Sequence, residues 1–105
     1  MTMMHLSENA VEIASLLSAM ANPKRLLILL NLLEGEMAVG ALATRVGLSQ
    51  SALSQHLSKL RAKKLVTTRR DAQTIYYSTR SEAVLMILRT LADIYAPSAG
   101  SKTAA

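Results

Sequence analysis

The stretch VGLSQSALSQHLSKLR, residues 46–61, decides the predicted fold because it reads as a tight turn followed directly by a helix. Gly47 permits the backbone conformation of the turn, and the hydroxyl of Ser49 can cap the helix by accepting a hydrogen bond from its first amides. Apolar residues then recur at helical spacing and are expected to face the core: Ala52, Leu53, Leu57 and Leu60.

The opposite face of this helix is polar and then cationic, and the helix contains no Asp or Glu. An ordinary amphipathic surface helix, the alternative for this segment taken alone, usually carries acidic residues as well. Short hydrogen-bonding side chains followed by cations are typical of a recognition helix, whose first turns meet base edges while later charges meet phosphate. The residues of this face are Gln50, Ser51, Ser54, Gln55, His56, Lys59 and Arg61.

Positive charge is concentrated in the same part of the chain. The net charge of the 105 residues is +5, but residues 37–80 alone hold eight Lys or Arg and one Asp. A solvated basic face would give the same count. Its coincidence with the candidate recognition helix favours a nucleic-acid-binding surface.

Composition excludes several classes of site. The chain has no Cys, which rules out disulfides, thiolate metal sites and thiol redox sensing. Aromatic platforms for stacking single-stranded bases are scarce, because the chain has three Tyr and no Phe or Trp. No carboxylate pair, nucleophile–base arrangement or phosphate-binding glycine loop is recognisable, so we do not expect an enzyme.

The longest apolar run, residues 26–30, is too short for a bilayer, and the N-terminus lacks a secretory pattern. We expect a cytoplasmic, nucleoid-associated protein with no membrane partner.

The remaining pattern predicts one mainly helical domain over residues 1–95 and a disordered tail over residues 96–105. The expected helices, besides the recognition helix, cover residues 9–20, the segment between the cap Asn22 and Gly35, residues 39–46 and residues 81–95.

A β-hairpin is expected after the recognition helix. Residues 65–70 and 73–78 are β-branched and alternating, with a turn at residues 71–72. A hairpin in this place is the wing of a winged helix-turn-helix. Its tip would carry Arg69, Arg70 and Gln73, which could reach the DNA backbone or a minor groove. Alternatively, the two arginines only protect an edge strand from aggregation.

The first and last helices carry more apolar surface than one buried face requires. Such surface suggests a subunit interface, so a homodimer is expected. The interface residues would be Val11, Ile13, Leu17, Leu85, Leu88, Leu91 and Tyr95.

The stretches ANPKRLLILLNLLEGEMAVGALA and VGLSQSALSQHLSKLRAKKLVTTRRDAQTIYYS resemble the ArsR/SmtB family of dimeric winged-helix repressors. The resemblance covers about residues 19–80 and, within the family, is greatest to nodulation repressors that lack metal-sensing cysteines. It implies four helices, a two-stranded wing and a fifth helix, a homodimer through the first and last helices, and a palindromic operator.

The resemblance also implies roles for individual residues. Gln50, Ser51, Ser54, Gln55 and His56 would read base edges. Ser49, Lys59 and Arg61 would position phosphates, and Arg69 and Arg70 would act from the wing. Glutamine is the strongest candidate for direct readout, because its amide can pair with adenine through two hydrogen bonds.

Two departures from the family bear on metal sensing. Many members carry a pattern like ELCVCDL, where this chain has EMAVGAL with Ala38 and Gly40 in place of the cysteines. Others bind zinc on the last helix, which here offers only Glu82 and Asp93 and no His. His5 and His56 are expected not to be ligands, so no metal, cofactor or thiol inducer is expected.

The sequence therefore predicts a homodimeric, sequence-specific, double-stranded DNA-binding transcriptional regulator. We expect a repressor that occludes promoters at a pseudo-palindromic operator, with nodulation genes among its candidate targets. The alternative is a winged-helix protein-interaction module whose apolar terminal helices serve a different partner.

Overall fold

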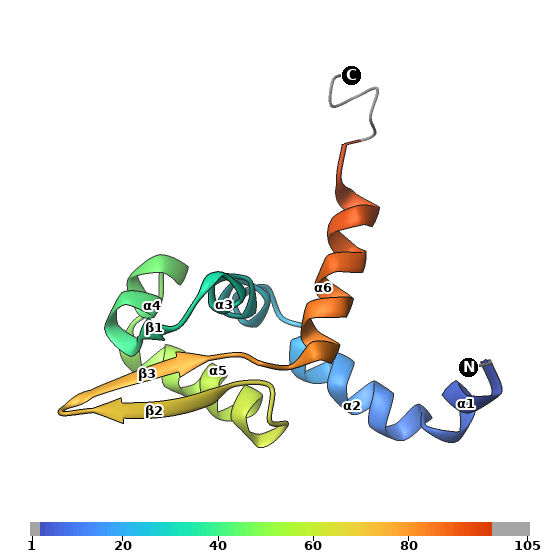
Figure 1. Cartoon of the computed structure of the whole chain (residues 1–105), viewed down its shortest axis with the longest axis horizontal. Helices are drawn as coiled ribbons and strands as arrows, with labels where there is room; N and C mark the ends of the chain where they lie inside the picture. The colour runs from blue at the N-terminus through green and yellow to red at the C-terminus, as the bar shows by residue number, and fades with distance from the viewer. Residues whose placement is uncertain (1–2, 98–105) are drawn as a thin grey trace.

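The computed structural model describes residues 3–97, which form a mainly helical fold with a small antiparallel sheet (Figure 1). Its elements are α1 (Met3–Glu8), α2 (Ala10–Met20), α3 (Pro23–Glu34), β1 (Met37–Ala38), α4 (Val39–Val46), α5 (Gln50–Ala62), β2 (Thr67–Asp71), β3 (Thr74–Ser78) and α6 (Glu82–Tyr95). The predicted winged helix-turn-helix is confirmed. Most of the predicted tail, residues 98–105, lies outside the described residues.

The first helical segment is longer than predicted, because α1 precedes α2. The break between them falls at Asn9, whose side-chain amide donates to the carbonyl of His5 at 2.9 Å. None of the α1 residues is buried, so no core pattern marks this helix in the sequence.

Helices α4 and α5 form the helix-turn-helix and pack against α3, and local signals define the ends of these helices as predicted. The side chain of Asn22 accepts from the amides of Lys24 and Arg25 at 2.9 and 3.1 Å. Gly47 ends α4 in the left-handed region, at φ 72° and ψ 43°. The hydroxyl of Ser49 accepts from the amide of Ala52 at 3.1 Å and caps α5.

The sheet differs from the predicted hairpin in two ways. A short strand, β1, pairs with β3 on the side away from β2, so the strand order is β1-β3-β2. The turn lies one residue later than predicted, at residues 72–73, because Asp71 pairs with Thr74 in the ladder. Ala72 takes the left-handed conformation, at φ 58°. Leu65 and Val66, which the sequence predicts as the start of a strand, are instead buried in the core before β2 begins.

The core lies where α3, α4, α5 and the start of α6 meet. Its largest fully buried side chains are Ile28, Leu29, Leu42, Leu53, Leu57, Leu60 and Val84. Ser81 caps α6 as predicted, by accepting from the amide of Val84 at 3.1 Å.

In Figure 1, α6 stands out from this body, and α1 and α2 extend from it on one side. Within residues 3–97 no single helix could cross a membrane; α2 and α3 meet the criteria of length and composition only when joined across a bend of 88°.

Candidate nucleic-acid interface

Helix α5 presents the exposed polar face that the sequence predicts. Leu53, Leu57 and Leu60 are buried, which fixes the rotation of the helix about its axis. Because successive residues turn by about 100°, Ser51, Gln55 and Ser58 lie on the side opposite those leucines. The exposed residues among the predicted set are Ser49, Gln50, Ser51, Ser54, Gln55, Lys59 and Arg61. Sequence reasoning missed Ser58, which is exposed in the middle of the same face.

His56 lies at the edge of this face and is half-buried rather than exposed. Its Nδ1 is 3.3 Å from Nη1 of Arg25. A guanidinium can only donate, so Nδ1 accepts and the proton of the neutral ring is on Nε2. Burial lowers the pKa of His56, and the neighbouring charges of Arg25, Lys59 and Lys24 lower it further. Arg25 therefore directs the ring toward α3, and burial together with the nearby cations disfavours its protonation.

Two cations at the start of α3 form hydrogen bonds with the ends of neighbouring helices. Nζ of Lys24 donates to the carbonyl of Val46 at 2.6 Å, at the end of α4. Nε of Arg25 donates to the carbonyl of Ala19 at 2.6 Å, at the end of α2. Cations are favourable at helix C-termini, where carbonyls lack helical partners. Neither role was predicted from the sequence, where the signal is two cations in the first turn of a helix, after Asn22 and Pro23.

The two arginines of the wing differ in their surroundings. Nε and Nη2 of Arg69 donate to the two carboxylate oxygens of Glu36, both at 2.8 Å. The guanidinium also lies 4.5 Å from the centre of the Tyr76 ring. The hydrogen bond from Arg69 holds the pKa of Glu36 below its usual range. The charge of Arg69 is thus paired within the chain.

Arg70 follows Arg69 on β2, so the two side chains leave opposite faces of the wing. Arg70 is exposed, and Gln73 is exposed in the turn at the tip. Arg70 therefore remains a candidate phosphate contact, while Arg69 holds the wing to the loop before β1.

The seven predicted interface residues differ in exposure. Val11, Leu17 and Tyr95 are 85%, 47% and 82% exposed. Ile13, Leu85 and Leu91 are half-buried. Leu88 belongs to the core and is only 6% exposed, so it can add little area to an interface between chains.

A hollow of about 310 Å³ lies between α3 and α6 and continues this apolar surface. Its lining residues are Leu26, Leu30, Leu88, Leu91, Ala92 and Tyr95.

The described residues contain no cluster of three or more His, Cys, Asp or Glu that could hold a metal ion. Gly40 is the second residue of α4, at one of the two positions where the resemblance to the family leads one to expect a cysteine. A Cβ atom built on Gly40 would lie 3.7 Å from Nε2 of Gln50, so this position faces the start of the recognition helix.

Comparison with known proteins gives consistent results. Residues 22–68 match the family described as "Bacterial regulatory protein, arsR family". The chain is 74% identical over 88 residues to "Nodulation protein NolR" of Rhizobium meliloti, covering 84% of this chain and 72% of that protein. It is 45% identical over 95 residues to "Transcriptional activator HlyU" of Vibrio cholerae, covering 90% of this chain and 88% of that protein.

Solved structures of bacterial transcriptional regulators are similar to this chain. NolR from Sinorhizobium fredii matches with a TM-score of 0.82 and 68% identity, over 87% of this chain and 91% of that one. The transcriptional repressor BigR from Xylella fastidiosa matches with a TM-score of 0.85 and 35% identity, over 90% and 97% of the two chains.

Proposed function

The chain belongs to the arsR family of bacterial regulatory proteins and is a DNA-binding transcriptional regulator, and from this premise we propose that it represses transcription as a homodimer. The exposed face of α5 carries the proposal. It offers serine and glutamine side chains in its first two turns, cations after them and no carboxylate from residue 49 to residue 63. Hydrogen-bonding groups at the start of a recognition helix can read base edges, and the cations can bind phosphate.

Individual roles follow from position on that face. Gln55 lies at its centre and can pair with adenine through two hydrogen bonds. Gln50, Ser51 and Ser54 flank it as further base contacts. Ser49, Lys59 and Arg61 contact phosphates, and Arg70 and Gln73 contact the DNA from the wing. The contribution of His56 is indirect, because Arg25 holds its ring toward α3.

A second copy of the chain is the partner that we propose for the apolar surface of α2 and α6. Exposed apolar patches of this kind mark interaction sites in globular proteins, and twofold dimers are the commonest assemblies. Val11, Leu17 and Tyr95 would become buried there, with Ile13, Leu85 and Leu91 completing the interface. The dimer would present two copies of α5 to one side of the DNA.

Two recognition helices related by a twofold axis require a pseudo-palindromic site. Its half-site centres would lie about 10 bp apart, or a multiple of that spacing. Occupying such a site in a promoter would exclude polymerase, and operator binding would place the protein at the nucleoid. Because NolR is named a nodulation protein, we include nodulation genes among the proposed targets.

The test is the selection of genomic fragments by the purified protein near physiological salt, followed by sequencing and by transcription assays on the recovered promoters. We expect one short inverted repeat to be enriched and transcription to fall when the protein is added. Increased transcription would contradict repression. Uniform recovery would contradict an operator, and no recovery of any DNA would favour a protein-interaction module.

A further inference from the structure

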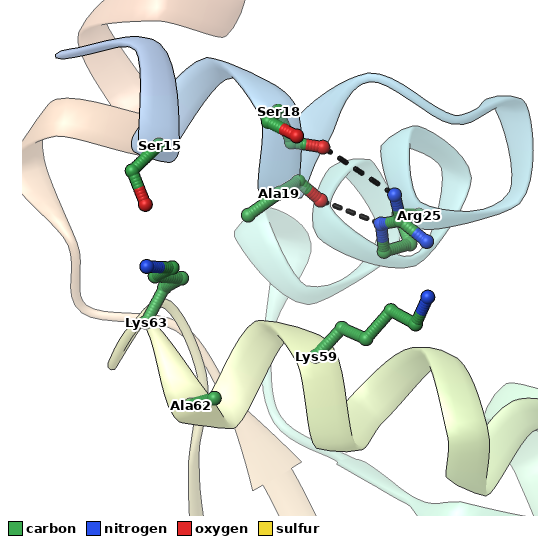
Figure 2. Close-up of a pocket in the computed structure, with 7 residues that line it drawn as sticks. All are labelled: Ser15, Ser18, Ala19, Arg25, Lys59, Ala62 and Lys63. Atoms are coloured by element: carbon green, nitrogen blue, oxygen red, sulfur yellow. Dashed lines mark hydrogen bonds between the residues drawn. The ribbon is translucent and has the colours of Figure 1, made fainter. Parts of the chain in front are cut away.

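A cleft of about 320 Å³ lies between the end of α2 and the last turns of α5. Figure 2 shows Ser15, Ser18 and Ala19 on one side of it and Lys59, Ala62 and Lys63 on the other. Arg25 lies at one end, with Lys59 extending toward it. Three of the seven lining residues are cations, and none is acidic.

Among the Lys and Arg side chains of residues 3–97, Arg45 and Arg69 form ion pairs with carboxylates, so the charges of Arg25, Lys59 and Lys63 are not neutralised in this way. Glu12 lines a neighbouring hollow together with Ser15 and Lys63. Burial lowers the pKa of His56 most, and the charges of Arg25 and Lys59 lower it further, which agrees with a positive potential beside the cleft. An anion in the cleft would therefore gain electrostatic energy.

The cleft also offers several hydrogen-bond donors, and contacts with the backbone hold one of them, Arg25, in place. Arg25 is held by the carbonyl of Ala19 at 2.6 Å and that of Ser18 at 3.4 Å, as the dashed lines in Figure 2 show. A guanidinium has five N–H groups. The contacts of Arg25 with the two carbonyls and with His56 use three of them. Two N–H groups of Arg25 remain, with the ammonium groups of Lys59 and Lys63 and two serine hydroxyls. Several donors with net positive charge match a phosphate group.

We propose that this cleft binds a phosphate group, either of a small phosphorylated ligand or of the DNA backbone beside the recognition helix. Ser15, Ser18 and Lys63 belong to none of the roles proposed above for DNA binding. Arg25 contacts both the cleft and His56 of α5, so the bound phosphate adjoins the recognition helix through one side chain. A DNA backbone as the source of the phosphate rests on the proposed function, whereas a small phosphorylated ligand does not, since free phosphate can be titrated without DNA.

The test uses the whole chain and inorganic phosphate as the probe, titrated at constant ionic strength and followed by backbone amide NMR shifts. Lys63→Gln removes one charge from the cleft. Lys64→Gln is the matched control, because Lys64 is exposed and does not line the cleft. We expect saturable shifts around residues 15, 18 and 63, an approximately tenfold weaker affinity in Lys63→Gln, and wild-type affinity in Lys64→Gln.

A second arm identifies the source of the phosphate. If phosphate does not bind the free protein, the salt dependence of DNA affinity is compared between the same variants. A slope reduced by about 0.9 in Lys63→Gln alone would place a DNA phosphate in the cleft and support the proposal. Equal behaviour of Lys63→Gln and Lys64→Gln in both arms would overturn it. Failure of the proposed operator binding would leave the phosphate titration unaffected, so the two failures are distinguishable.

Discussion

Nη1 of Arg25 lies 3.3 Å from Nδ1 of His56, which joins the first turn of α3 to the middle of α5. The same guanidinium donates to the carbonyl of Ala19 at the end of α2. One side chain therefore connects three helices on one side of the recognition helix. The orientation of α5 depends on this contact as well as on its buried leucines.

The surroundings of His56 make stability depend on pH. The pKa of His56 is lowered in the folded chain, first by burial and then by Arg25, so the unfolded chain binds a proton more readily. The stabilisation is complete above about pH 6.5, the ordinary histidine pKa, and is lost as pH falls from there through the folded pKa. Urea unfolding at about pH 7.5 and about pH 5.5 measures it. We expect the free energy of unfolding to fall more in wild type than in His56→Gln, and equal losses would contradict this.

The elements that the sequence predicts well are those with local determinants. Asn22 with Pro23, Gly47, Ser49 and Ser81 all mark helix ends where the structure has them. Non-local determinants were missed. Strand β1 exists only because Met37 and Ala38 pair with β3, far along the chain. The turn position follows from the pairing register rather than from the composition of the turn.

The features of the candidate site also differ in whether local sequence or distant residues determine them. The exposed face of α5 follows from helical periodicity, which the sequence contains in full. The surroundings of Arg69 and His56 do not, because their partners Glu36 and Arg25 are 33 and 31 residues away. A charged residue can be assigned to the surface from sequence, but its pairing there depends on how distant elements pack.

The turn before α5 requires glycine. Gly47 has φ 72°, which costs a residue with a Cβ about 1–2 kcal/mol. Gly47→Ala should therefore lower the free energy of unfolding by about that amount. Gly40→Ala is the control, because Gly40 lies inside α4 with space for a methyl group, and the change should raise stability by about 0.5 kcal/mol. Urea denaturation measures both, and effects of the same sign would contradict the argument.

Base discrimination should depend on Gln55. Gln55→Ala removes the side-chain amide and therefore one pair of base contacts. The difference in binding free energy between operator and scrambled DNA should then shrink by about 1–3 kcal/mol. Lys59→Gln is the comparison, since the loss of a phosphate contact weakens binding to both DNAs alike. Fluorescence anisotropy with the two duplexes measures the ratios. If Gln55→Ala weakens both duplexes equally, Gln55 does not read a base.

The two wing arginines should contribute unequally to DNA binding. The charge of Arg70 is free to bind phosphate, so Arg70→Gln should reduce the slope of log affinity against log salt by about 0.9. The charge of Arg69 is already paired with Glu36, so Arg69→Gln should change the slope less. Glu36→Gln tests whether the ion pair or the location of Arg69 limits its contribution to DNA binding. The substitution releases the charge of Arg69, so the slope should become steeper. A larger slope change in Arg69→Gln than in Arg70→Gln would show that Arg69 leaves Glu36 to bind DNA.

Dimerisation should depend on side chains that a single chain leaves exposed. Val11 is 85% exposed, so Val11→Glu should not disturb the fold of one chain but would place a charge in the proposed interface. Sedimentation equilibrium at micromolar concentration should give a dimer for wild type and a monomer for this variant, with unchanged circular dichroism. Thr68→Glu, on the exposed strand β2, is the control and should stay dimeric. The monomeric variant should also lose most operator affinity, since one recognition helix then binds without the other. A dimeric Val11→Glu protein would exclude this part of α2 from the interface.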